Sequence, residues 1–304
     1  MRIILIGQAA FAEKTLDKLV SKGEDVLAVF CFPDAPGGKI DPVKQRALQL
    51  GIPVHQHKTL KTPEVTEQFV SLKADLAILA FVSQIIPPPV FNAPRFGSIC
   101  YHPSLLPKYR GRTAINWALI RGETVTGLTI FWLDKGIDTG PILLQKEVQV
   151  APDDTTGTLY FNKLFPLGVE AIAEAVDLVK AGNPPRIAQD ESKATYDPPC
   201  GDEHAKIDWN KPAQEVYNLI RGCDPQPGAH TTHNGRMVRL FDARLQKGAN
   251  SASAGQVTGI GSEDIAIALN GGTLSVRRMR GDGGKITAAE FSKQGDLSIG
   301  AQLG

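Results

Sequence analysis

The chain has 304 residues, which is long enough for two hydrophobic cores, because single domains usually stop growing near about 250 to 300 residues. Its 33 basic and 32 acidic residues nearly cancel, so the overall charge gives no case for nucleic acid or a membrane surface as a partner. Four widely spaced cysteines without a C-x-x-C motif, and the lack of an apolar run near the roughly 18 residues of a membrane span, lead us to expect a cytoplasmic protein with unpaired thiols.

Short apolar runs alternate with helical patterns through the first half of the chain. The apolar runs predict strands at residues 3–6, 26–30, 76–80, 98–101, 128–133 and 142–150. Amphipathic stretches bounded by glycine or proline predict helices at residues 11–19, 43–50, 63–72 and 112–121. Residues 155–180 form one more helical stretch, which we expect Pro166 to kink or divide. This order predicts an α/β domain with a Rossmann-like, mostly parallel sheet that helices cover on both faces.

The character of the chain changes between residues 183 and 204, where four prolines punctuate a polar stretch without any period. We interpret residues 1–182 as a first domain, 183–204 as a linker and 205–304 as a second domain. After the linker, residues 212–221 predict a short helix, and residues 237–241, 265–269 and 274–278 predict strands separated by glycines. The spacing of these strands predicts a small all-β barrel or sheet.

Two polar side chains that follow predicted strands are the candidate catalytic residues. His102 comes directly after the strand at 98–101, and Asp138 follows the strand at 128–133 within a turn-like segment. Side chains at the carboxyl edge of an open α/β sheet project into its crevice. An imidazole can donate to a carbonyl oxygen, and a carboxylate can take a proton from an attacking group, which together suits acyl transfer without a covalent nucleophile. Taken alone, His102 could be structural and Asp138 a backbone cap.

Longer motifs around these residues resemble the folate-dependent formyltransferase family, which moves the formyl group of 10-formyltetrahydrofolate. The resemblance runs through most of the chain. The motifs that carry it are Ile6-Gly-Gln8, Tyr101-His-Pro-Ser-Leu-Leu-Pro107, Ala114-Ile-Asn-Trp117, Thr129-Ile-Phe-Trp132, Leu143-Leu-Gln-Lys-Glu147, Pro152-Asp-Asp-Thr155, Thr158-Leu-Tyr160, Leu164-Phe-Pro166 and Ile220-Arg-Gly222. It implies the formyltransferase fold with an OB-like carboxy-terminal barrel. Within the family, the chain is most similar to the amino-terminal formyl-hydrolase domain of 10-formyltetrahydrofolate dehydrogenase.

The resemblance assigns roles to particular positions. It implies that His102 donates to the formyl oxygen and that Asp138 is the general base, or the anchor that orients water or another acceptor. It also implies that Phe81, Gln84 and Ile86 belong to a segment whose backbone contacts the pterin ring of the folate. Asp134 is expected in a turn near the pterin, with a second catalytic carboxylate as the alternative. Both Asp134 and Asp138 are also expected among the folate-binding positions. No metal is expected among these residues.

Position 100 departs from the pattern of many relatives, which have asparagine two residues before the histidine. A strand places Cys100 and His102 on the same face, so both can reach the site. A thiol is a much weaker donor than a carboxamide, and losing one good oxyanion donor costs about a hundredfold to a thousandfold in rate. The resemblance implies that the formyl-hydrolase domain also lacks this asparagine, so the departure favours that subgroup. A small buried hydrophobe is the plainer interpretation of Cys100.

Other polar features are given plainer roles. Lys108 and Arg110 follow the histidine motif and are interpreted as solvated loop charges, with contact to an anionic substrate or the folate glutamate as the alternative. Backbone N–H groups at Gly7 to Ala10, where the first helix opens, are suited to an anion. That segment lacks G-x-G-x-x-G, so a nicotinamide dinucleotide site is not supported.

The leading hypothesis is an enzyme that cleaves the formyl group from 10-formyltetrahydrofolate and passes it to water, a carrier thiol or an amine. The competing hypotheses are a methionyl-tRNA formyltransferase, a sugar-nucleotide formyltransferase and, from another class, a non-catalytic folate-binding module. The short segment at 33–42 holds only Lys39 as a cation, which argues against tRNA as a partner. In the dehydrogenases a carrier domain and an aldehyde-dehydrogenase domain follow; both are absent here, so a free-standing enzyme and a fragment both stay open.

Overall fold

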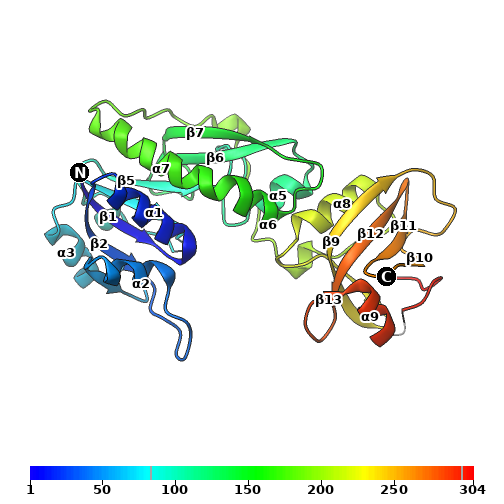
Figure 1. Ribbon diagram of the computed structural model, residues 1–304. Coiled ribbons are helices and arrows are strands. Elements are labelled where there is room, and N and C mark those ends of the chain that lie inside the picture. Colours follow the sequence, from blue (N-terminus) through cyan, green and yellow to red (C-terminus); the bar gives the residue numbers. More distant parts are fainter. Residues whose placement is uncertain (83, 296) are drawn as a thin grey trace. The chain divides into compact units, whose positions relative to one another are not determined.

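The chain divides into two compact units in a computed structural model that describes residues 1–82, 84–295 and 297–304 (Figure 1). The first unit consists of Met1–Arg112, Gly127–Val148 and Asn162–Tyr196, and the second of Thr113–Thr126, Gln149–Phe161 and Asp197–Gly304. The segment interpreted as a linker is shared, since residues 183–196 belong to the first unit and 197–204 to the second. Domain boundaries at 182 and 204 stay a prediction. None of the described helices has the length and apolar character of a membrane span.

A seven-stranded sheet forms the centre of the first unit. Its strands are β1 (Arg2–Gly7), β2 (Asp25–Cys31), β3 (Val54–Gln56), β4 (Leu76–Ala80), β5 (Ser98–His102), β6 (Val125–Trp132) and β7 (Ile142–Gln149), in the order β3-β2-β1-β4-β5-β6-β7. The strands from β3 to β5 pair in parallel, whereas β6 runs antiparallel to β5. The predicted α/β class is confirmed, and β3 is an additional strand whose three residues are too few to give a period.

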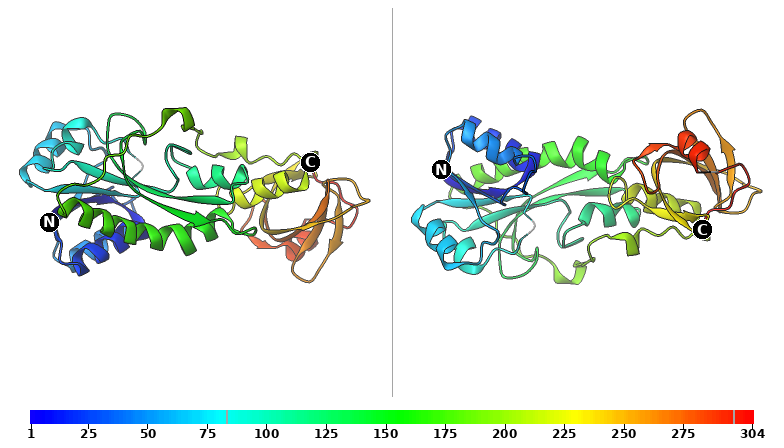
Figure 2. Two further views of the ribbon diagram at one scale, coloured as in Figure 1. Left: turned by 90° about the horizontal axis from the view of Figure 1, so that it is seen from above. Right: turned by 90° about the horizontal axis from the view of Figure 1, so that it is seen from below.

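Helices cover both faces of this sheet, as the near-continuous apolar strands predict. Figure 2 shows α1 (Ala9–Ser21), α2 (Pro42–Gln49) and α7 (Phe165–Lys180) on one face and α3 (Pro63–Ser71) on the other. The short α4 (Pro88–Phe91) shares a buried cluster with α3 and with alternate residues of β1, β2 and β4. On the opposite face, Phe11 of α1 lies against Tyr101 of β5, with ring centroids 4.4 Å apart. Since successive strand residues alternate between faces, Cys100 and His102 point away from Tyr101.

The helical stretch predicted at residues 155–180 is present but divided. It consists of α6 (Thr156–Leu159), a π-helical turn at Tyr160–Leu164 and α7. Thr155 and Thr158 cap α6 reciprocally, and Pro166 stands in the first turn of α7, where its missing N–H needs no partner. The predicted division therefore occurs through a π turn just before Pro166.

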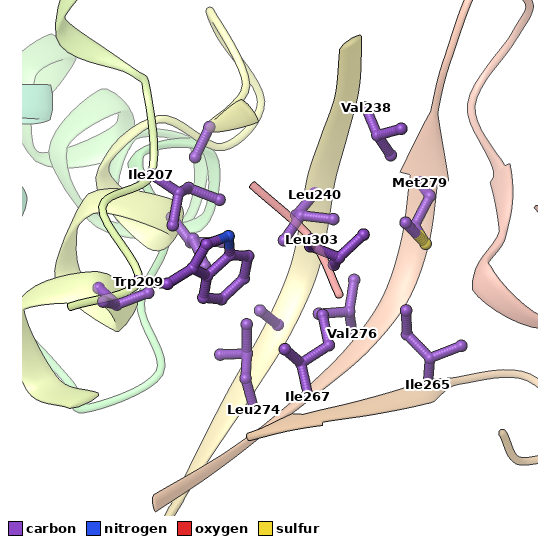
Figure 3. Close-up of a cluster of buried hydrophobic side chains, with 14 of the residues drawn as sticks. Ile207, Trp209, Val238, Leu240, Ile265, Ile267, Leu274, Val276, Met279 and Leu303 are labelled. Atoms are coloured by element: carbon purple, nitrogen blue, oxygen red, sulfur yellow. The ribbon is translucent and has the colours of Figure 1, made fainter. Parts of the chain in front are cut away.

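The second unit is built on an antiparallel sheet and the helices α5 (Ala114–Ile120), α6, α8 (Ala213–Gly222) and α9 (Ala288–Gln294). Its strands are β8 (His230–His233), β9 (Arg236–Lys247), β10 (Val257–Ile260), β11 (Ile265–Leu269), β12 (Gly272–Arg280) and β13 (Ile286–Thr287). The order β10-β11-β12-β9-β8, with β13 beside β12, forms an antiparallel half-barrel, which confirms the expected small β domain after the α/β sheet. Apolar side chains of β9, β11 and β12 gather around Trp209 (Figure 3). The indole of Trp209 donates to Thr231 Oγ1 at 3.0 Å, which satisfies its polar atom inside the core.

Candidate active site

His102 is the last residue of β5 and is nearly buried, with 5% of its surface exposed. Its Nε2 donates to the backbone oxygen of Tyr109 at 2.8 Å. A carbonyl oxygen can only accept, so this bond fixes a hydrogen on Nε2. The nitrogen left for chemistry is therefore Nδ1.

Asp138 faces that nitrogen from the loop between β6 and β7. Its Oδ2 lies 3.6 Å from His102 Nδ1, and the same oxygen accepts the backbone N–H of Gly111 at 2.7 Å. The backbone of Asp138 has φ +55°, in the left-handed region that Asn and Asp tolerate better than most residues. Its side chain is 18% exposed and that of His102 only 7%. The pair is thus largely shielded from water, where opposite charges interact more strongly than in bulk solvent.

Cys100 lies two residues before His102 on β5. Burial, and then the negative charge of Asp138, raise the pKa of the Cys100 thiol well above its usual range. The thiol therefore stays protonated at neutral pH, which makes it a weak donor and excludes a resting thiolate nucleophile. It lies against the apolar cluster on the α3 face, as expected of a small buried hydrophobe.

Three of the five positions predicted to bind folate lie just beyond β4 in different environments. Phe81 is 48% exposed with φ +62° and lines a small apolar pocket at the ends of β1, β2 and β4. Gln84 donates its side-chain amide to the Lys58 oxygen at 2.7 Å, and the Ile86 side chain is buried in the cluster beneath α3 and α4. The pocket residues are Ile6, Gly7, Phe30, Cys31, Phe32, His57, Leu60, Phe81 and Val82. The role of these positions in folate binding stays a prediction.

Asp134 holds the turn of its own loop. Its Oδ1 accepts the backbone N–H of Gly136 at 3.0 Å and the Thr139 hydroxyl at 2.6 Å. This arrangement fits the predicted turn residue. Since the carboxylate stabilises the segment that carries Asp138, its effect on the site is indirect.

The structure gives partners from within the chain to two polar features, and it contradicts the interpretation of the second. The backbone N–H of Ala9, at the start of α1, donates to both carboxylate oxygens of Asp41, at 3.1 and 3.0 Å, so the chain supplies its own anion there. Arg110 is not a solvated loop charge, because its side chain is 2% exposed and bonds to Glu191 and Gln189. Both partners are distant in the sequence, which is why the local pattern around Arg110 gave no sign of burial.

Several residues that shape the site were missed by the sequence analysis. The loop after His102 rests on Thr129, which is fully buried in β6, accepts the N–H of Leu106 at 3.1 Å and donates to Ser104 at 2.7 Å. Gln145 donates to the Leu106 oxygen at 2.8 Å and to Thr129 at 2.9 Å. A threonine within the apolar run at 128–133 was the one available signal. These bonds hold the backbone that presents the Tyr109 oxygen to His102.

The fold and the site together define an α/β protein with a buried histidine–carboxylate pair and a separate antiparallel carboxy-terminal unit. A family model described as "Formyl transferase" matches residues 1–176, and "Formyl transferase, C-terminal domain" matches residues 201–295. The chain belongs to the formyl transferase family, a family of enzymes of folate one-carbon metabolism. The expected family membership is confirmed.

Relatives within the family include two kinds of enzyme. The chain is 40% identical to the cytosolic 10-formyltetrahydrofolate dehydrogenase of Xenopus laevis, over 97% of this chain and 34% of that protein. It thus spans about a third of the length of the curated dehydrogenases that it matches. It is also 39% identical to the methionyl-tRNA formyltransferase of Trichlorobacter lovleyi, over 99% of this chain and 96% of that protein. The crystal structure of HypX from Aquifex aeolicus in complex with tetrahydrofolic acid has the same fold, with a TM-score of 0.73 at 20% identity over 98% of this chain and 48% of that one.

Proposed function

We propose that this chain cleaves the formyl group from 10-formyltetrahydrofolate and passes it to water or to another acceptor, releasing tetrahydrofolate. The observation that carries the proposal is the shielded His102–Asp138 pair, at 3.6 Å, in a chain of the formyl transferase family. The similarity to 10-formyltetrahydrofolate dehydrogenases supports this donor. The folate would bind at the carboxyl edge of the first sheet, near Phe81, Gln84 and Ile86.

The geometry suits a direct transfer through a tetrahedral intermediate. As the acceptor attacks the formyl carbon, Asp138 takes its proton. His102 stabilises the developing oxyanion through a hydrogen on Nδ1, which it carries in the imidazolium form because Nε2 already donates to the Tyr109 oxygen. The C–N bond to the folate then breaks, and Asp138 returns the accepted proton to the folate nitrogen as it leaves. With water as acceptor, the products are formate and tetrahydrofolate. The Cys100 thiol adds at most a weak hydrogen bond, so this site is expected to be slower than one with an amide donor at that position.

The test is a product analysis with purified full chain. Incubation with 10-formyltetrahydrofolate alone should release formate and tetrahydrofolate in equal amounts if water is the acceptor. Formation of tetrahydrofolate only after an acceptor is added would identify a transferase instead. Failure to consume 10-formyltetrahydrofolate with water, a carrier thiol, an amine or methionyl-tRNA would refute the proposal.

Methionyl-tRNA formylation is the second candidate, and one observation favours it: the Trichlorobacter lovleyi relative matches over nearly its full length. Near-neutral charge, the single cation Lys39 in the short segment at 33–42 and the thiol at position 100 count against it. We expect any binding of initiator tRNA to be weak and to fall steeply with salt, because phosphate contacts alone would supply it. Tight, salt-resistant binding with formylation of the methionyl group would establish this second function.

Two more functions have less support. A sugar-nucleotide formyltransferase is disfavoured by Cys100, and a non-catalytic folate-binding module is disfavoured by the preserved His102–Asp138 pair. We also propose a cytoplasmic location, since all four cysteines are free thiols, which suits a reducing compartment.

A further inference from the structure

A strap, residues 185–196, runs across the first unit between the two loops that carry the candidate site. At its start Ile187 and Ile142 exchange backbone hydrogen bonds of 2.7 and 2.9 Å. At its end the Thr195 N–H donates to the Pro107 oxygen at 3.1 Å, and the Arg110 N–H donates to the Thr195 oxygen at 3.0 Å. The strap is therefore bonded both to the loop after His102 and to the start of β7, which follows the Asp138 loop.

Gln189 is the strap residue that reaches the Asp138 loop. Its side-chain amide donates to the backbone oxygens of Asp138 and Gly140, each at 2.8 Å. Its side-chain oxygen accepts from Arg110 Nη2 at 2.8 Å and from Nε at 3.2 Å. The reverse orientation of the amide would set its oxygen against two carbonyl oxygens, so the neighbours fix which end faces Asp138.

The Arg110 guanidinium, which donates to Gln189, also binds a carboxylate of the strap. It bonds both carboxylate oxygens of Glu191, at 2.6 and 3.0 Å, and lies 5.5 Å from the centre of the Tyr196 ring. A buried, bidentate guanidinium is a rigid anchor. Arg110 also directly follows Tyr109, whose oxygen accepts from His102. One network thus links the backbone that orients the imidazole with the backbone that carries the carboxylate.

Asp138 needs such support because its left-handed backbone conformation is costly for a residue with a side chain. Conformations of this kind persist only where the surroundings impose them. From these contacts we propose that Gln189 is a positioning residue, which holds the Asp138 carboxylate at its distance from His102 by binding the Asp138 and Gly140 carbonyls. This inference rests on the proposed function for its effect on catalysis, but not for its effect on the loop.

Gln189→Glu is the sharpest variant. Glutamate has the same shape and keeps an acceptor for Arg110, but it replaces the amide donor with an oxygen that faces the Asp138 and Gly140 carbonyls. Hydrogen–deuterium exchange at residues 134–140 should become about tenfold faster while the core of the first sheet stays protected. The kcat for 10-formyltetrahydrofolate should fall about tenfold to a hundredfold, since small displacements of catalytic groups have effects of this size. KM should change by less than about threefold.

Two further variants make the outcome decisive. Gln189→Ala removes the donor without adding charge and should change exchange and kcat in the same direction. Gln246→Glu makes the same chemical change at an exposed position of β9 in the second unit and should leave both unchanged. Parental exchange at residues 134–140 in Gln189→Glu and Gln189→Ala would overturn the inference, as would an equal loss of protection throughout the unit. A parent that consumes no 10-formyltetrahydrofolate with any of the acceptors would refute the proposed function, and the exchange result alone would then decide the role of Gln189.

Discussion

The substitution Asp138→Asn separates the chemistry of the site from its scaffold. Asparagine, like aspartate, is among the side-chain-bearing residues best able to keep the left-handed backbone at position 138, where φ is +55°. Its side-chain oxygen can still accept the Gly111 N–H, which now lies 2.7 Å from Oδ2. The variant should therefore fold and bind folate as the parent does, and it loses only the charge and the ability to accept a proton.

The expected loss of rate follows from the distance between the paired groups. At 3.6 Å from His102 Nδ1, a carboxylate stabilises an imidazolium by about 4 to 5 kcal/mol at an effective dielectric constant of about 20. General acid–base assistance is worth about a hundredfold to ten-thousandfold, or about 2.7 to 5.4 kcal/mol. Both arguments predict that kcat falls by at least about a hundredfold.

The assay is the release of tetrahydrofolate under single-turnover conditions, with folate affinity measured separately by calorimetry. His102→Ala should also slow turnover, and the double variant should lose much less than the product of the two single effects, because both groups act on one transition state. Parental turnover by well-folded Asp138→Asn would show that Asp138 is not the base, whatever the family of the chain.

Three further predictions concern the scaffold. Burial raises the pKa of Asp224 in the folded state, so the charge of this carboxylate opposes folding at neutral pH. Asp224→Asn should therefore raise Tm at pH 7, and thermal melts should show that this gain disappears as the pH falls through the carboxyl pKa. Gly168→Ala should lower Tm in calorimetry with unchanged fold by circular dichroism, because an added Cβ would lie 2.5 Å from the Tyr101 ring; an unchanged Tm would contradict this packing. The Cys200 and Cys223 sulfurs lie 4.0 Å apart, so glutathione disulfide should oxidise them to a disulfide and itself be reduced to two glutathione molecules. Peptide mass mapping would detect the new disulfide, and Cys200→Ala is the control.

Local patterns in the sequence were sufficient to predict the α/β fold and the position of His102 at the end of its strand. Strands buried on both faces read as continuous apolar runs, and helices repeat their apolar residues every three to four positions, so both types were recognisable without any knowledge of packing. The end of the run at 98–101 placed His102 at the carboxyl edge of the sheet, which β5 confirms. The family motifs extend over both units and predicted a small carboxy-terminal β domain.

The interpretation of residues 183–204 shows what local patterns miss. Prolines and the lack of a period are typical of linkers, but the polar side chains of the strap find partners far away in the chain. Gln189 binds backbone oxygens 51 and 49 positions earlier, and Arg110 binds Glu191 81 positions later. Any residue offers a backbone oxygen, so acceptors such as those of Tyr109 and Asp138 have no signature in the sequence.

The sequence by itself thus determined the strands and helices, the family and the identity of His102 and Asp138 as candidates, because these depend on side-chain type and local spacing. Only the tertiary structure decided that Nδ1 of His102 faces Asp138 and that Arg110 is buried. These features depend on backbone conformation and on contacts between segments dozens of residues apart. Such contacts form only when the sheet brings those segments together.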